Sequence, residues 1–183
     1  MTSPVVWQLD GQLLAILHDM VLAELEVVFE RVEAGAYVLT LVGARRPSTL
    51  VWLIAGEQAV SVEAFVMHVV DVAGQPTLDR APLHRYLLAR NLRLRDVHFG
   101  LDDVGDVFLT GSLPHAAVDA VTLDRLLGEV LQLLEDSRTS LVELAYGDRL
   151  EREPALAAKV LADGAGRRPA GTPDWAPRRD VRR

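Results

Sequence analysis

The sequence predicts an α+β domain in which helices accompany an antiparallel sheet, and three observations lead to this fold class. Short segments rich in β-branched and aromatic residues follow one another between residues 27 and 69, separated by loops of a few residues. Parallel neighbours would need crossovers of about a dozen residues, so these strands are expected to be antiparallel. A second pair of such segments lies between residues 97 and 111, and apolar residues at helical spacing come before, between and after the two groups.

The first half of the chain predicts one helix and four strands. Apolar residues at helical spacing indicate a helix over residues 10–24, and Asp10 is a suitable N-cap for it. β-branched and aromatic residues then predict strands over residues 27–29, 36–42, 50–55 and 59–69. Because the intervening loops are short, the four strands should form a meander.

The second half predicts a helix, a hairpin and a long final helix. Pro82 suits the first turn of a helix that runs to about residue 92. Residues 97–101 and 106–111 flank an Asp-Asp-Val-Gly turn and should pair as a hairpin. Thr122 is expected to be the N-cap of the last helix. The apolar stripe of that helix consists of Leu123, Leu126, Leu127, Val130, Leu131 and Leu134, and the pattern extends through Leu141, Leu144 and Ala145. Pro154 allows a short helix after it.

Composition indicates one domain followed by a tail. The chain has 183 residues, of which half are apolar and a quarter are charged, as is typical of a globular protein with a sizeable core. We expect the domain to span residues 1–163 and a disordered Arg-, Pro- and Gly-rich tail to span residues 164–183. No apolar run approaches the roughly 20 residues that cross a bilayer, and the first residues lack the positive region of a signal peptide. These features predict a cytoplasmic protein with no membrane partner.

Charge is distributed unevenly between the domain and the tail. The net charge of the chain is −7. Residues 1–163 contain 13 Arg and Lys against 24 Asp and Glu, whereas residues 164–183 contain six Arg against two Asp. Because a nucleic-acid platform needs a basic face, the acidic domain predicts no nucleic-acid partner.

No residue pattern predicts a catalytic, cofactor-binding or metal-binding site. The chain has no Cys, which excludes thiolate metal sites and thiol nucleophiles. A calcium loop opening at Asp102 would need oxygen ligands where Val104 and Leu113 stand, so the aspartates there are interpreted as turn residues. The histidines lack the short spacing of a zinc site, and Ser112 lacks the second glycine of a nucleophile elbow. We therefore expect no cofactor and no enzyme activity.

The strands carry apolar side chains on both faces, which favours a protein-binding surface. In residues 59–69, Val60, Val62, Ala64 and Val66 should point one way, and Ser61, Glu63, Phe65 and Met67 the other. One face must meet the helices, so the other presents aromatic groups beside polar ones and suits a dimer or peptide interface. A second layer of helices covering that face is the alternative. The candidate partner-binding residues are Trp52, Phe65, Met67 and Phe108, together with Arg85 and Arg90, which are suited to an acidic peptide or to ion pairs with the acidic domain.

A likeness to a known family is carried by five strings: VWLIAGEQAVSVEAFVM, LLARN, FGLDDVGDVFLTGSLPHAAV, TLDRLLGEVL and LVELAYG. Together they resemble the actinobacterial YbjN-domain family, whose fold is similar to type III secretion chaperones of the CesT kind. The likeness covers about residues 13–150. It implies an α-β-β-β-α-β-β-α order with three or more strands in the first group, a peptide-binding, chaperone-like or regulatory role, and no catalytic residues.

These observations predict a non-catalytic module that binds an extended or helical peptide of a partner protein, as a homodimer. The first alternative is a regulatory domain that senses a small ligand in a pocket between sheet and helices. The second is an unrecognised enzyme, which would need titratable groups with perturbed pKa values within hydrogen-bond reach of one another.

Overall fold

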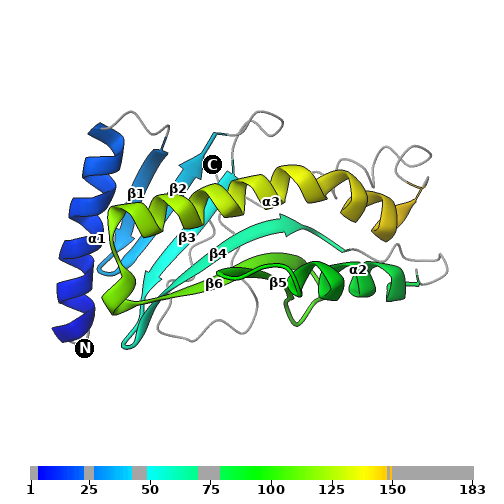
Figure 1. The fold of residues 1–183 in the computed structure, drawn as a ribbon, viewed down its shortest axis with the longest axis horizontal. Helices are drawn as coiled ribbons and strands as arrows, with labels where there is room; N and C mark the ends of the chain where they lie inside the picture. Colours follow the sequence, from blue (N-terminus) through cyan, green and yellow to red (C-terminus); the bar gives the residue numbers. More distant parts are fainter. Residues whose placement is uncertain (1–3, 23–26, 43–48, 70–78, 148, 150–183) are drawn as a thin grey trace.

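The computed structural model describes residues 4–22, 27–42, 49–69, 79–147 and 149. Within them the chain forms a helix, four strands, a second helix, a hairpin and a third helix (Figure 1). The elements are α1 (Pro4–Leu22), β1 (Val27–Glu33), β2 (Ala36–Leu41), β3 (Thr49–Ala55), β4 (Ala59–Met67), α2 (Ala81–Asn91), β5 (Val97–Leu101), β6 (Val107–Pro114), the short 3₁₀ helix η1 (His115–Ala117) and α3 (Ala120–Tyr146). The predicted tail and the helix allowed after Pro154 lie outside the described residues.

The six strands form one antiparallel sheet in the order β1-β2-β3-β4-β6-β5. The first four strands are the predicted meander, and the predicted hairpin joins it through β6. Because β6 lies between β4 and β5, the sheet ends in β1 on one side and in β5 on the other. Gly35 lies in the β1–β2 turn with a φ of 79°, a conformation that favours glycine.

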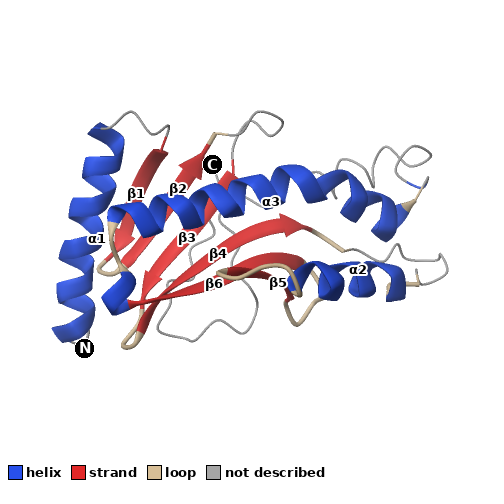
Figure 2. Ribbon diagram, viewed as in Figure 1, coloured by secondary structure: helices blue, strands red, loops and turns tan. Residues whose placement is uncertain are grey.

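All three helices pack on the same face of the sheet, so the fold has two layers (Figures 1 and 2). The main apolar cluster joins α1, α2 and α3 to alternate residues of the strands, and its fully buried members include Leu13, Leu17, Leu39, Leu53, Leu83 and Leu123. Each such leucine stabilises the fold by about 1.5–3 kcal/mol through burial. The alternative in which helices cover both faces is not seen in the described part of the chain.

The β5 edge of the sheet is closed by a side chain of α2. The Asn91 amide nitrogen donates to the carbonyl oxygen of Phe99 at 2.9 Å, and its amide oxygen accepts from the Phe99 backbone N–H at 2.8 Å. One side chain thus satisfies the two backbone groups of Phe99, at the middle of β5, that a seventh strand would otherwise pair with. Asn91 is the last residue of α2, so the end of this helix and the edge of the sheet are tied together.

Three sequence-based expectations about local structure are wrong. Asp10 lies inside α1, not at its start, because the helix already begins at Pro4. The N-cap of α3 is Asp119, whose carboxylate accepts from the Thr122 backbone N–H at 2.8 Å, so Thr122 belongs to the first turn. Met67 does not share a face with Phe65, because a bulge between them shifts the register against β6. Met67 instead belongs to the cluster beneath the helices.

Replacing Gly111 by alanine is expected to destabilise the protein by about 1–3 kcal/mol, the cost of overpacking a close contact. A Cβ atom on Gly111 would lie 2.7 Å from the Asp96 carbonyl oxygen and 2.9 Å from Cγ1 of Val97, so the backbone leading into β5 would have to move. Urea unfolding measures the loss. Gly128→Ala in α3 is the matched control, because nothing lies within 4 Å of its added Cβ. The control should be stabilised by up to about 1 kcal/mol through helix propensity, and equal losses in both variants would contradict the steric argument.

Candidate functional site

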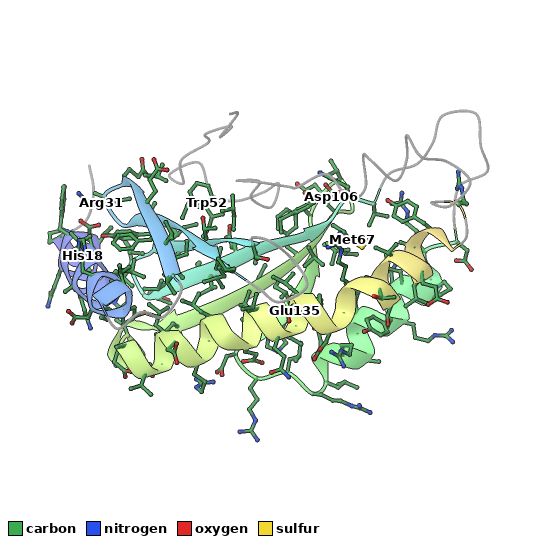
Figure 3. All side chains as sticks on the ribbon, turned by 90° about the horizontal axis from the view of Figure 1, so that it is seen from above. His18, Arg31, Trp52, Met67, Asp106 and Glu135 are labelled. Carbon is green, nitrogen blue, oxygen red and sulfur yellow. The ribbon has the colours of Figure 1, made fainter. Side chains whose placement is uncertain are left out.

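The outer face of the sheet is the side opposite the helices, and its residues alternate along each strand with residues of the main cluster. One cross-strand row runs from Glu30 through Val38, Trp52, Glu63 and Thr110 to His98. Figure 3 shows Trp52 on the side of the sheet away from α3. Ile54, Ser61, Phe65 and Phe108 belong to the same face by register.

Two apolar groups lie on the outer face. Trp52, Ile54 and Val38 form a small cluster, with Val32 and Leu50 packed against it, and every member comes from β1, β2 or β3. Phe65 and Phe108 pair across β4 and β6 with their ring centroids 5.4 Å apart and an edge-to-face angle of 76°. Such aromatic pairs stabilise by about 0.5–1.5 kcal/mol beyond the area they bury.

The sequence predicted that the aromatic residues of the outer face are exposed. The structure shows that they are buried. Trp52 and Phe108 are each 1% exposed, and Phe65 is 5% exposed. Two polar residues of the same face, Ser61 and Glu63, are half-buried. The face therefore combines buried aromatic groups with a carboxylate beside them.

The cross-strand row of the outer face contains two carboxylates, Glu30 and Glu63, and no arginine or lysine. Glu63 stands opposite Trp52 on one side and Thr110 on the other, while Glu30 lies opposite Val38 at the β1 end of the row. Arginine and lysine are attracted both to carboxylates and to the face of a tryptophan ring. The arrangement can therefore hold an apolar segment that also carries arginine or lysine.

The side chains of Asp102 and Asp106, at the β5–β6 turn, accept hydrogen bonds from backbone N–H groups. One carboxylate oxygen of Asp102 accepts from the N–H groups of Val104 and Asp106, at 3.0 and 2.9 Å. Asp106 in turn accepts from the Val69 N–H at 2.9 Å, and its other oxygen lies 2.9 Å from Nδ1 of His68. The interpretation as a turn former is thus confirmed for Asp102, whereas the carboxylate of Asp106 links the turn to the residues after β4. Among the residues that the structure describes, no group of three or more His, Asp or Glu side chains is placed to hold a metal ion.

Asp10 is the buried polar centre that the sequence did not reveal. Its carboxylate accepts from the Tyr37 hydroxyl at 2.5 Å and from the Gly35 N–H at 2.8 Å, and it pairs with the guanidinium of Arg31. Burial raises the pKa of Asp10, but the hydrogen bonds from Tyr37, Gly35 and Arg31 outweigh it and hold the pKa below its usual value. Burial and the bond to Asp10 together raise the pKa of Tyr37. The group joins α1 to the β1–β2 hairpin, which is a structural role.

The structure brings together only some of the predicted partner-binding residues. Trp52, Phe65 and Phe108 share the outer face, whereas Met67 lies in the main cluster and is removed from the candidate surface. Arg85 and Arg90 lie on α2, in the helical layer. The Arg90 guanidinium lies 6.0 Å from the centre of the Tyr86 ring, and its Nη2 atom lies 3.5 Å from the Ser137 hydroxyl of α3. Arg90 therefore helps to pack α2 on α3, while Arg85 is exposed.

The chain matches the model of the YbjN family, described as "Putative bacterial sensory transduction regulator", over residues 19–143. Proteins of Mycobacterium tuberculosis and Mycobacterium leprae are 38% and 39% identical to the chain over 118 and 116 residues. These alignments cover 64% and 63% of this chain. The chain spans only about three fifths of the length of these curated relatives, 61% and 60%.

Comparison with solved structures supports the fold. ExsC in the ExsC–ExsE complex aligns with a TM-score of 0.52 and 19% identity, over 73% of this chain and 96% of that chain. The ExoU–SpcU complex of the Pseudomonas aeruginosa type III secretion system aligns with a TM-score of 0.39 and 19% identity, over 58% of this chain and 82% of that chain. The predicted fold class, an antiparallel sheet with helices of the secretion-chaperone type, is confirmed. No helix among the described residues is long and apolar enough to cross a membrane.

Proposed function

The chain belongs to the YbjN family, and from that premise we propose that it is a non-catalytic module whose outer sheet face binds a segment of a partner protein in the cytoplasm. The observation that carries the proposal is the collection of Trp52, Phe65 and Phe108 on a face to which the three described helices do not contribute. Large aromatic side chains are the commonest anchors of protein interfaces. ExsC, which has a similar fold, is also held in a complex with another protein.

The chemistry of the outer face specifies the kind of segment. Trp52 and Phe108 are each 1% exposed, so leucine or aromatic side chains of the partner would pack on them only after whatever covers them is displaced. The arginine or lysine groups of the partner would meet Glu63 and Glu30. An ion pair placed next to aromatic rings is partly desolvated, so it adds specificity as well as affinity. Since the described domain is acidic as a whole, a basic segment would also be attracted at long range.

Homodimerisation, which the sequence also predicts, stays a prediction. Asn91 disfavours a dimer formed by pairing two β5 edges, because its side chain already occupies the backbone groups of Phe99 there. A dimer that extends the sheet through β5 would have to displace this side chain.

Replacing Glu63 by glutamine is expected to weaken binding of the partner segment at least tenfold. Truncating one member of a desolvated charge pair costs about 2–5 kcal/mol, and about 1.4 kcal/mol corresponds to a factor of ten. The partner is first identified by cross-linking in cytosol and mass spectrometry, and its cross-linked segment is then synthesised and titrated calorimetrically.

Glu143→Gln is the matched control, because Glu143 is exposed on α3 in the helical layer. Its affinity for the segment should equal that of the unmodified protein. Equal affinity for the Glu63 variant and the control, or cross-links that map to the helical layer, would contradict the proposed binding face.

A further inference from the structure

The burial of the outer face exceeds what its own strands can supply. A side chain on one face of a sheet keeps its outward surface in water unless something lies over it, as Val28 on β1 does at 65% exposure. Trp52, Ile54 and Phe108 are each only 1% exposed. The three described helices pack on the opposite face. Some other part of the chain is needed to account for this burial.

We propose that the chain's own C-terminal segment, residues 150–183, covers the outer face and competes there with the partner. The internal ranges outside the described residues have no more than nine residues each, whereas the C-terminal segment has 34 residues. The competition with a partner rests on the proposed function. The covering of the outer face rests only on the burial of Trp52 and Phe108. It departs from the prediction, drawn from composition alone, that residues 164–183 form a disordered tail.

The end of α3, the last described element before this segment, is linked to the outer face through His68. Helix α3 ends at Tyr146, whose hydroxyl donates to the backbone oxygen of His68 at 2.8 Å. His68 follows β4, and its ring lies 4.6 Å from the ring of Phe65, which belongs to the outer face. An extended chain advances about 3.3 Å per residue, so 34 residues reach about 110 Å, whereas six strands spaced about 4.8 Å apart span less than 30 Å. The segment is long enough to cross the whole sheet.

Charge and side-chain type match as well. Residues 164–183 carry six Arg and two Asp, while the outer face presents Glu63 beside Trp52 and Glu30 on β1, beyond Val38. Arginine over a tryptophan ring and next to a carboxylate is the combination that the face is suited to hold. Trp175 and the apolar residues Leu156, Val160 and Leu161 add groups that can pack on the aromatic cluster.

A covering segment makes partner binding conditional. The apparent affinity of a site falls in proportion to the fraction of molecules in which the site is open. A partner must therefore outcompete the tail, and any change that weakens the tail should strengthen partner binding. The Arg-rich segment thus acts as an internal competitor at the proposed binding face.

The test uses the accessibility of Trp52 in the full chain. Trp7→Phe and Trp175→Phe leave Trp52 as the single tryptophan, and acrylamide quenching of its fluorescence then reports its exposure. In this background, Arg167, Arg168, Arg178 and Arg179 are all changed to glutamate. We expect the quenching constant to rise at least threefold, and an unchanged constant would overturn the inference. A parallel chain that keeps only Trp7, which is 55% exposed, controls for general effects and should not respond.

A second arm removes the segment altogether. In the chain ended after Arg149, provided that circular dichroism shows it folded, Trp52 should be quenched as in the charge-reversed chain, and a synthetic peptide of residues 150–183 should restore its protection. Trp52 that stays unquenched without the segment would overturn the inference. So would protection that is lost on dilution of the full chain, because a second copy would then be the cover. If the shortened chain does not fold, the full-chain charge reversal decides.

The two proposals fail in different ways. If the inference is wrong, the quenching constant of Trp52 stays the same after every change in the tail, while the Glu63 variant still loses affinity for the partner. If the proposed function is wrong, the Glu63 variant binds the partner as the unmodified protein does, while Trp52 still becomes accessible to the quencher when the tail is altered. If both hold, reversal of the four arginine charges should tighten binding of the partner segment.

Discussion

Replacing Asp10 by alanine is expected to lower the free energy of unfolding by about 3–5 kcal/mol, because two hydrogen bonds from buried donors to a charged group are lost, at about 1.5–3 kcal/mol each. The carboxylate is 5% exposed, and it accepts hydrogen bonds from the Tyr37 hydroxyl and the Gly35 N–H while pairing with Arg31. Without it, the Gly35 N–H would lose its acceptor in a site with little access to water, and the Tyr37 hydroxyl would keep only the backbone oxygen of residue 10, at 2.9 Å. Chemical denaturation followed by circular dichroism measures the loss.

Asp119→Ala serves as the control for Asp10→Ala. Asp119 is also a helical aspartate with a hydrogen bond to a backbone N–H, but it is an exposed N-cap whose lost bond water can replace. Its loss should be clearly smaller. Equal losses in the two variants would contradict the central role of Asp10.

The same group should make stability depend on pH in the acid range. The folded-state pKa of Asp10 lies below the ordinary value of 3.8, so the ionised carboxylate makes its full contribution to the free energy of unfolding above pH 3.8. The contribution is lost as the pH falls below 3.8 and through the lower folded-state pKa. Asp10→Asn removes this titration, so its stability should fall less steeply with acid than that of the unmodified chain. Parallel acid profiles for the two proteins would contradict the assignment.

Replacing Phe108 by alanine is expected to cost about 3–5 kcal/mol, as truncation of a buried phenylalanine does. Phe108 is 1% exposed and meets the ring of Phe65 edge to face. From the sequence, Phe65 was expected to face a partner, in which case its truncation would cost little stability in the isolated protomer. Since Phe65 is 5% exposed, we now expect a substantial loss from its truncation too.

A double-mutant cycle on Phe65 and Phe108 tests whether the two rings act as a pair. Their coupling should be about 0.5–1.5 kcal/mol, the usual worth of an aromatic pair beyond its buried area. Val28→Ala, at an exposed position of the outer face on β1, is the control and should change stability little. A loss below about 1 kcal/mol for Phe108→Ala would show that the outer face is open to solvent, against the structure.

The regular elements could be predicted because their signal is local. The meander of residues 27–69, the turn at Asp102 and the long apolar stripe of α3 each depend on residues a few positions apart, and each prediction is confirmed. Local signals were weaker at the ends of elements. Several polar residues near a helix start can serve as its cap, and the extended backbone at Asp119, not a difference of residue type, selects it over Thr122.

The candidate surface was only half predictable. Alternation along β4 correctly assigned Phe65 and Glu63 to one face, but it cannot reveal a bulge, and one extra residue moved Met67 to the opposite face. Arg85 and Arg90 were chosen for their charge. Only the packing of α2 on α3 shows that Arg90 contacts Tyr86 and Ser137 in the helical layer.

By itself, then, the sequence determined the class of the fold, the order of its elements and the presence of apolar groups on both faces of the sheet, because hydrophobic period and turn chemistry act over short distances. The tertiary structure alone decided which groups meet. Asp10 joins a hairpin more than twenty residues away, Asn91 closes the β5 edge, and the aromatic residues of the outer face are buried instead of exposed. Those outcomes depend on how separate elements pack against one another. Contacts between residues far apart in the sequence produce no periodic pattern of residues, so they cannot be predicted from the sequence alone.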